Sequence, residues 1–90
     1  MSMNGKTGYD EAALRDAHRH TIRNRGEIER SQICHCICCR TYFRPSEIDS
    51  YADGGETVIC PYCDCDAVIG DGSGVALADD LLQQMHERYF

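Results

Sequence analysis

Hydrophobic and polar positions divide the chain into a helical start, a middle of short alternating segments and a helical end. In the start, residues 10–17 are mostly good helix formers, with acids in the first turn where the helix dipole favours them. Apolar residues are sparse on the expected inner face of this helix: Ala13, Leu14, Ala17 and Ile22. So narrow a stripe predicts a helix on the surface rather than one that builds the core.

Two further helices are predicted. Asn24, followed three residues later by Glu27, has the spacing of an N-cap and its capping-box partner, which predicts a short helix over residues 25–30. Gly26 argues against one continuous helix through this region. The closing segment, residues 78–90, has apolar side chains at helical spacing that can pack on the rest of the chain: Leu81, Leu82, Met85 and Tyr89.

Between the helical segments the pattern changes to short β-prone stretches separated by turns. Strands are predicted within residues 40–43, 57–59 and 67–69, because these stretches are rich in β-branched or aromatic residues. Turns are predicted at Pro45, at the Asp-Gly-Gly-Glu sequence 53–56 and at a glycine-rich linker, residues 70–74.

These elements predict a small α+β metal-bound domain, a ribbon of short antiparallel β hairpins flanked by N-terminal and C-terminal helices. One domain is expected. Its segments are a disordered N-terminus, a helical N-terminal segment, the ribbon, and a C-terminal helix packed on the ribbon: residues 1–8, 9–32, 33–74 and 75–90.

Composition points to a stabilising element other than a large core. The chain has 90 residues, no tryptophan and seven cysteines, and so high a cysteine content is typical of cross-linked or metal-bound scaffolds. An odd number leaves one thiol outside any complete disulfide framework. Met1–Thr7 is polar and no apolar segment of a secretory leader follows it. We therefore expect a cytoplasmic protein without a membrane span, whose clustered cysteines bind metal.

Two Cys-x-x-Cys pairs carry the clearest chemical signal. Cys36 and Cys39 form the first pair, Cys60 and Cys63 form the second, and 20 residues separate the pairs. Each pair can form a tight turn that presents two thiolates to one ion, and a hairpin between the pairs would bring the turns together, as in a zinc ribbon. We predict that these four residues bind one structural Zn²⁺ ion.

Three cysteines and a histidine close to the pairs have no assigned role. Cys34, His35 or Cys38 could replace a cysteine of the first pair as a ligand, and Cys65 follows the second pair. His35 is expected at the surface or hydrogen-bonded to a ligand. A second ion would have only these four residues as donors, and a buried cysteine can also serve as a small hydrophobic residue.

Iron is the rival of zinc at the four cysteines, because four thiolates in two turns also describe a rubredoxin-like site. The likeness to rubredoxins is confined to the two turns. Arg40 and Asp64 stand where that family has a glycine after the second cysteine of each pair, and this chain has few aromatic residues to fill such a core. Zinc is therefore favoured.

Several stretches of the chain together carry a family resemblance: residues 24–31, 34–43, 45–48, 60–63, 66–74 and 81–90. In these stretches the sequence resembles a family of small, uncharacterised bacterial zinc-ribbon proteins, and the likeness extends over about two thirds of the chain. The family has glycine in place of His35 and Asp64, an aromatic residue in place of Cys38 and an apolar one in place of Cys65. The resemblance implies a ribbon that does not need Cys38 or Cys65 for its metal, and it implies no activity, since the family has no established function.

Charge is unevenly distributed along the chain. Residues 1–45 carry eight basic and five acidic side chains, whereas residues 46–90 carry one basic and ten acidic side chains, which gives the net charge of −6. The arginines of the helical start are candidate nucleic-acid contacts: Arg15, Arg19, Arg23, Arg25 and Arg30. The acidic second half, and the further negative charge of a zinc ion bound to four thiolates, oppose this interpretation.

An enzyme is not predicted, because four thiolates would close the coordination of zinc and leave no activated water. A thiol redox role would rest on Cys34, Cys38 and Cys65. We predict a non-catalytic zinc-ribbon adaptor that binds a macromolecular partner, in the first place a protein. The alternatives are a nucleic-acid-binding ribbon and a rubredoxin-like iron or thiol redox protein. The identity of the partner and the oligomeric state stay open.

Overall fold

Strand β1 is the centre of a three-stranded antiparallel sheet, with β2 on one side and β5 on the other. A separate two-stranded sheet joins β3 to β4. The strands are β1 (Cys34–Cys36), β2 (Tyr42–Phe43), β3 (Tyr51–Ala52), β4 (Thr57–Val58) and β5 (Val68–Gly70). In the computed structural model, which describes residues 9–90, the chain thus has the predicted small α+β architecture with short antiparallel strands. The prediction for residues 1–8 lies outside the described part.

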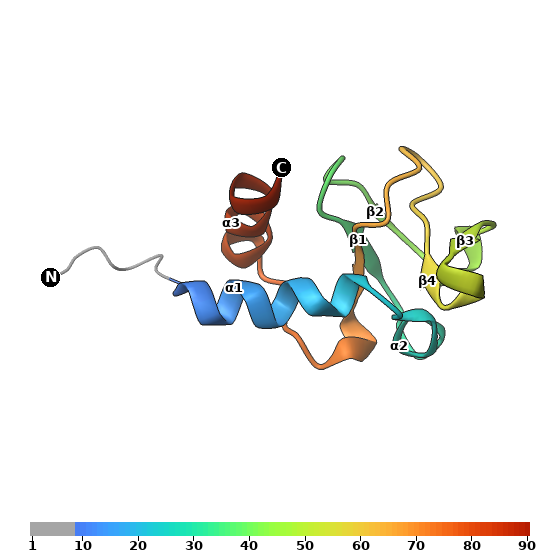
Figure 1. Cartoon of the computed structure of the whole chain (residues 1–90), viewed down its shortest axis with the longest axis horizontal. Helices are drawn as coiled ribbons and strands as arrows, with labels where there is room; N and C mark the ends of the chain where they lie inside the picture. Colours follow the sequence, from blue (N-terminus) through green and yellow to red (C-terminus); the bar gives the residue numbers. More distant parts are fainter. Residues whose placement is uncertain (1–8) are drawn as a thin grey trace, which may run out of the picture.

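Three helices surround the larger sheet, and each coincides with a predicted one: α1 (Glu11–His18), α2 (Arg25–Glu29) and α3 (Asp79–Tyr89). In Figure 1, α1 runs along the long axis, α3 crosses above it, and α2 lies at the end that is close to the β3–β4 hairpin. Short 3₁₀ turns connect the elements: Arg19–Thr21, Pro45–Glu47, Asp53–Gly55 and Asp71–Ser73. Among residues 9–90, none of the helices has the length and apolar character needed to cross a membrane.

The core lies between the sheet and the helices. Its side chains come from all three helices and from the strands or the residues next to them: Leu14, Ala17, Ile28, Ile37, Val58, Val68, Ile69, Leu81, Leu82 and Met85. Two residues predicted for the inner face of α1 are not buried there, and the prediction is wrong for both. Ala13 is exposed, and Ile22 is 48% exposed. Ile22 lies off the helical face because the helix tightens to a 3₁₀ turn at Arg19–Thr21, after which Ile22 has an extended backbone.

Asn24 occupies the predicted N-cap position of α2, but the capping box is wrong. Within the described chain its side chain makes no capping bond to α2. The carboxamide is buried and donates instead to the carbonyl of Val68, while Glu27 contacts His20 at 3.0 Å. Long-range hydrogen bonds have replaced the local ones because this residue lies between α2 and the strands, where backbone groups need partners.

The glycine-rich stretch 70–74 is more than the predicted linker. Gly70 ends β5 opposite Cys34, and the following 3₁₀ turn packs on α2. A Cβ atom added at Gly70 would lie 2.2 Å from Ser31 Oγ, and one at Gly72 would lie 2.6 Å from the carbonyl oxygen of Glu27. Glycine is needed at these two positions because α2 approaches the backbone so closely.

Candidate metal centre

Two turns of the same construction form the candidate metal centre. The first follows β1 and holds Cys36 and Cys39, and the second follows β4 and holds Cys60 and Cys63. In each turn the amide four residues after the first cysteine donates to the carbonyl of that cysteine, at 2.8 Å from Arg40 and 3.0 Å from Asp64. Both turns lie at the same end of the molecule, where Figure 1 shows their loops beside one another.

Arg40 and Asp64 close the turns with left-handed backbones, at φ 67° and 65° respectively. These are the two positions at which a rubredoxin-like turn has glycine. A side chain in this region costs some conformational energy, which the two turns tolerate in the same way. Both positions thus have the left-handed backbone that glycine favours, so the absence of glycine there does not count against iron at this site.

The two turns bring the four predicted ligands together. Cys36 Sγ lies 3.6 Å from Cys63 Sγ, and Cys39 Sγ lies 3.7 Å from Cys60 Sγ. All four sulfurs lie within 4.8 Å of one another. A tetrahedral zinc ion with metal–sulfur bonds of about 2.3 Å would separate its ligand sulfurs by about 3.8 Å. The four thiols are thus within metal-binding distance, and their spacing fits one tetrahedral ion.

Electrostatics in the cluster also fit a cation. Burial raises the pKa of the Cys36 and Cys60 thiols, because a buried thiolate loses its hydration. Burial also opposes ionisation of Cys39, but hydrogen bonds from Thr41 and the neighbouring thiols bring the pKa of Cys39 down to about 7. The amide of Tyr62 points at Cys60 Sγ at 3.3 Å. A divalent ion would supply the positive charge that the buried thiolates need.

Helix α3 contacts the first turn through the side chain of His86. The ring nitrogen Nδ1 of His86 lies 2.8 Å from the carbonyl oxygen of Ile37, the residue after Cys36. The amide of Ile37 donates to the carbonyl of Ala67 at 2.8 Å, and the amide of Cys60 donates to the carbonyl of Cys65 at 2.9 Å. The first turn is therefore joined to Ala67 by a backbone bond and to α3 by the His86 side chain, and a backbone bond from Cys60 to Cys65 closes the second turn.

His35 lies in the middle strand β1, and the prediction that it is at the surface or bonded to a ligand is wrong. It is 1% exposed, and neither ring nitrogen finds a hydrogen-bond partner among residues 9–90. Its ring packs on the ring of Tyr42, 4.5 Å between centroids. Burial, and to a smaller degree the charge of Arg40, lower the pKa of His35 to about 4. The side chain is kept neutral as part of the core.

The three unassigned cysteines separate into two kinds. Cys34 is fully buried in β1 and belongs to the hydrophobic core. Cys38 and Cys65 are half-buried and lie close together, with their sulfurs 3.1 Å apart. Both are also within 4.8 Å of the Cys63 sulfur. No local pattern marks this pair, because 26 residues lie between Cys38 and Cys65 and only the fold of both turns brings them together.

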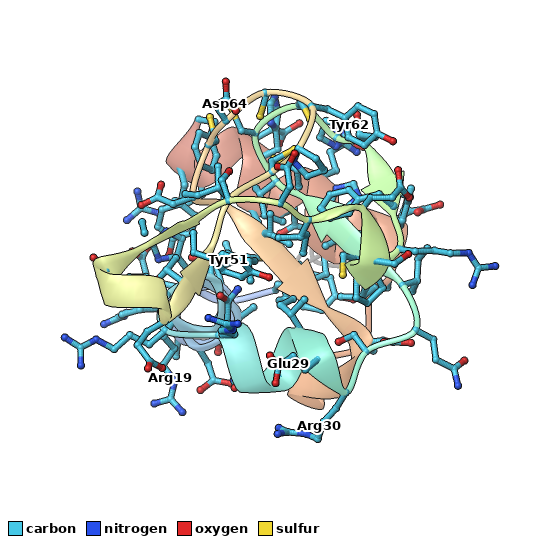
Figure 2. All side chains as sticks on the ribbon, turned by 90° about the vertical axis from the view of Figure 1, so that its right-hand side faces the viewer. Arg19, Glu29, Arg30, Tyr51, Tyr62 and Asp64 are labelled. Carbon is cyan, nitrogen blue, oxygen red and sulfur yellow. The ribbon has the colours of Figure 1, made fainter. Side chains whose placement is uncertain are left out.

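The five candidate nucleic-acid contacts do not gather in one site. Arg19, in the 3₁₀ turn after α1, pairs with Asp16 of α1 at 3.4 Å. Arg25 is held by Glu29 and by the carbonyl of Gly55, and its guanidinium lies 4.4 Å from the ring centroid of Tyr51. Figure 2 shows Arg19 and Arg30 projecting from different elements, away from the end that carries Tyr62 and Asp64. Arg15 and Arg23 are exposed.

Comparisons of the chain with protein-family models, with curated proteins and with solved structures each gave no match. The residues of the chain itself define the candidate site. Its elements are two four-residue turns, four thiols within metal-binding distance and a half-buried thiol pair beside them.

Proposed function

We propose that the protein is a non-catalytic adaptor of the zinc-ribbon class, which binds another protein. One structural zinc ion, held by Cys36, Cys39, Cys60 and Cys63, would fix the two turns to each other. The observation that carries this proposal is the spacing of the four sulfurs, which fits a closed four-thiolate tetrahedron. In such a site the ion contributes to folding and has no open position for a substrate.

The choice of a protein partner is supported by the outer face of α3. Its inner face supplies Leu81, Leu82 and Met85 to the core, while the outer face borders a shallow hollow of about 370 Å³. Two glutamines and two acids line this hollow: Asp80, Gln83, Gln84 and Glu87. With ten acids in residues 46–90, the surface is complementary to a basic protein rather than to a polyanion.

Nucleic-acid binding is the second function considered, and the arginine positions support it less. Arg19 already pairs with Asp16 of α1 and Arg25 with Glu29 of α2, while Arg30 lies at the C-terminal end of α2. A mobility-shift assay at low salt tests it directly. A salt-sensitive shift that Arg19→Ala with Arg30→Ala abolishes would favour nucleic acid over the protein adaptor.

The partner proposal is tested by affinity capture with a matched pair of variants. Gln83→Lys with Glu87→Lys changes the charge of the α3 face, and both side chains lie outside the core. Gln32→Lys with Glu29→Lys makes the same change of charge on exposed residues at the other side of the fold. We expect the wild type and the second variant to retain a common protein from native-cell extract, and the first variant to lose it.

One outcome would contradict the α3 interface, and another would contradict the protein adaptor. Equal retention by both charge variants would remove the α3 face from the interface. Loss of the captured protein on nuclease treatment would show that nucleic acid mediates the contact. The identity of the metal is tested separately by the visible absorption spectrum of the purified protein. A zinc site is colourless, whereas an iron centre with four thiolates absorbs visible light.

A further inference from the structure

Cys38 and Cys65 are a thiol pair that bridges the two turns without belonging to the four-cysteine set. Cys38 lies between Cys36 and Cys39 in the first turn, and Cys65 follows the second turn. Their sulfurs are 3.1 Å apart, nearer than the 3.6 Å and 3.7 Å that separate neighbouring sulfurs of the four-cysteine set. The short separation sets this pair apart, because sulfurs bound to one tetrahedral ion stay about 3.8 Å from each other.

We propose that Cys38 and Cys65 form a redox modification site, in which a peroxide converts the two thiols to a disulfide while the other four cysteines keep their metal ion. The proposal rests on the metal centre of the proposed function, and it adds a covalent link between the turns that the ion already joins. The link is local, since a disulfide sulfur–sulfur bond is about 2.05 Å long and the two sulfurs need only a small approach.

The fold has already brought the reacting sulfurs together. The amide of Cys60 donates to the carbonyl of Cys65, and the amide of Ile37, next to Cys38, donates to the carbonyl of Ala67. These bonds hold both turns in place before any oxidation occurs. Ring closure across the intervening chain therefore costs little further entropy, which favours this pair over random thiol pairing.

Exposure separates this pair from Cys36 and Cys60, and metal coordination would separate it from Cys39 and Cys63. Cys36 and Cys60 have no exposed surface, whereas Cys39 and Cys63 are half-buried, like Cys38 and Cys65. Metal coordination would further engage the electron pairs of the four ligand sulfurs. In the metal-loaded protein, Cys38 and Cys65 would therefore be the half-buried thiols whose sulfurs are not engaged by the ion.

The charge near the pair selects the class of oxidant. Asp64 and Asp66 flank Cys65 in the sequence, and Figure 2 shows Asp64 at the outer end of the second turn. Carboxylates here repel an anionic disulfide such as oxidised glutathione, but they do not repel a neutral peroxide. Hydrogen peroxide is therefore the oxidant class to which the site is open.

The reaction balances in two steps. One of the two sulfurs, as thiolate, attacks a peroxide oxygen, which breaks the O–O bond, forms a sulfenic acid and releases hydroxide that becomes water. The other sulfur attacks the sulfenic sulfur, loses its proton and expels a second water. Two thiols and one hydrogen peroxide thus give one disulfide and two waters, and peroxide is the electron acceptor.

A second metal ion is the competing use of the same residues, because Cys38, Cys63 and Cys65 also lie within 4.8 Å of one another. Such an ion would share Cys63 with the first. The 3.1 Å separation favours the disulfide over this ion, since two sulfurs on one metal would be forced farther apart. Metal stoichiometry of the reduced protein distinguishes the two.

The experiment treats the zinc-loaded, reduced full chain with increments of hydrogen peroxide and follows three quantities. These are the disulfide connectivity from non-reducing peptide mass spectrometry, the zinc content, and the rate at which a chelator removes zinc. We expect a Cys38–Cys65 disulfide to form first with zinc retained, and zinc release to slow by about tenfold or more in the oxidised chain, because the linked turns cannot separate. Cys38→Ser and Cys65→Ser should each abolish both effects.

Cys34→Ser is the matched control, since this cysteine is buried in β1 and lies outside the pair. It should leave the disulfide and the slower release unchanged. Oxidation of the four ligand cysteines with zinc loss while Cys38 and Cys65 stay reduced would overturn the proposal. So would two zinc ions per reduced chain with the second lost in Cys65→Ser. A purified protein without metal contradicts the proposed function instead, and specific Cys38–Cys65 pairing in that protein would still support the thiol pair.

Discussion

The side-chain amide of Asn24 donates to the backbone carbonyl of Val68 at 2.7 Å, and this buried bond joins the start of α2 to strand β5. The same carboxamide accepts a bond from the amide of Val58 in β4 at 3.2 Å. One side chain thus links the helical segment to both sheets, and it joins β4 and β5, the strands before and after the second cysteine turn.

Replacing Asn24 with alanine should destabilise the folded protein by about 2–4 kcal/mol, because the change leaves the buried Val68 carbonyl and Val58 amide without partners. The measurement is urea unfolding of the zinc-loaded protein. Gln32→Ala, at an exposed position, is the control and should change the free energy of unfolding by less than about 0.5 kcal/mol. Equal effects of the two substitutions would show that the Asn24 bonds do not hold the sheets.

Gly70→Ala and Gly26→Ala should have opposite effects on stability. At Gly70 the new methyl group would meet Ser31 Oγ at 2.2 Å and Ile28 Cδ1 at 2.9 Å, so crowding should cost about 1–3 kcal/mol or more. At Gly26, inside α2, the nearest atom is the far end of the Arg30 side chain at 3.7 Å, and alanine should stabilise the helix by about 0.5–1 kcal/mol. Thermal unfolding of the two variants measures both, and a stabilised Gly70→Ala would contradict the close packing of α2 on β5.

His35→Phe should stabilise the protein at neutral pH, since it removes two buried ring nitrogens that have no partner among residues 9–90. The pKa of His35 is lowered to about 4 in the folded state, below its ordinary value of 6.5. As the pH falls from 7 to 5, His35 binds a proton in the unfolded wild type but not in the folded one, so the wild type loses stability. The advantage of the variant should grow by about 1–2 kcal/mol over this range.

The comparison for His35 is made between two proteins with the same cysteines, so that acid effects on the metal centre cancel in the difference. Zinc content of both proteins is measured at each pH. The residues that face His35 are Arg40, Asp79 and His86 by their charge and Tyr42 by its ring, and all four are unchanged in the variant. A stability difference that stays constant between pH 7 and 5 would show that His35 is protonated in the fold or bonded to solvent.

The elements that the sequence predicted correctly have a local signal. Leu81, Leu82 and Met85 recur at helical spacing in α3, and the two Cys-x-x-Cys pairs need only two tight turns to point their thiols at one place. Binary pattern and motif spacing encode such features within a few residues. The positions of α2, β4 and β5 also followed from local composition.

The features that the sequence did not reveal depend on contacts between distant segments. Asn24 looks like a cap because its local spacing is that of a capping box, yet its partners are Val58 and Val68. His35 looks like a polar surface residue because the residues next to it in the sequence do not indicate that its strand will lie between β2 and β5. The Cys38–Cys65 contact arises only when both turns are formed. Local patterns contain no information on these pairings, so tertiary structure decides them.

The metal centre is the central claim, and X-ray absorption at the zinc edge of the purified, reduced protein, with elemental analysis of the same sample, tests it most directly. We predict one zinc ion per chain with four sulfur neighbours at about 2.3 Å. Cys36→Ser and Cys63→Ser should lose the ion, whereas Cys65→Ser should keep the same four-sulfur spectrum. A protein without metal, or a zinc ion with nitrogen or oxygen neighbours in place of a sulfur, would contradict the account.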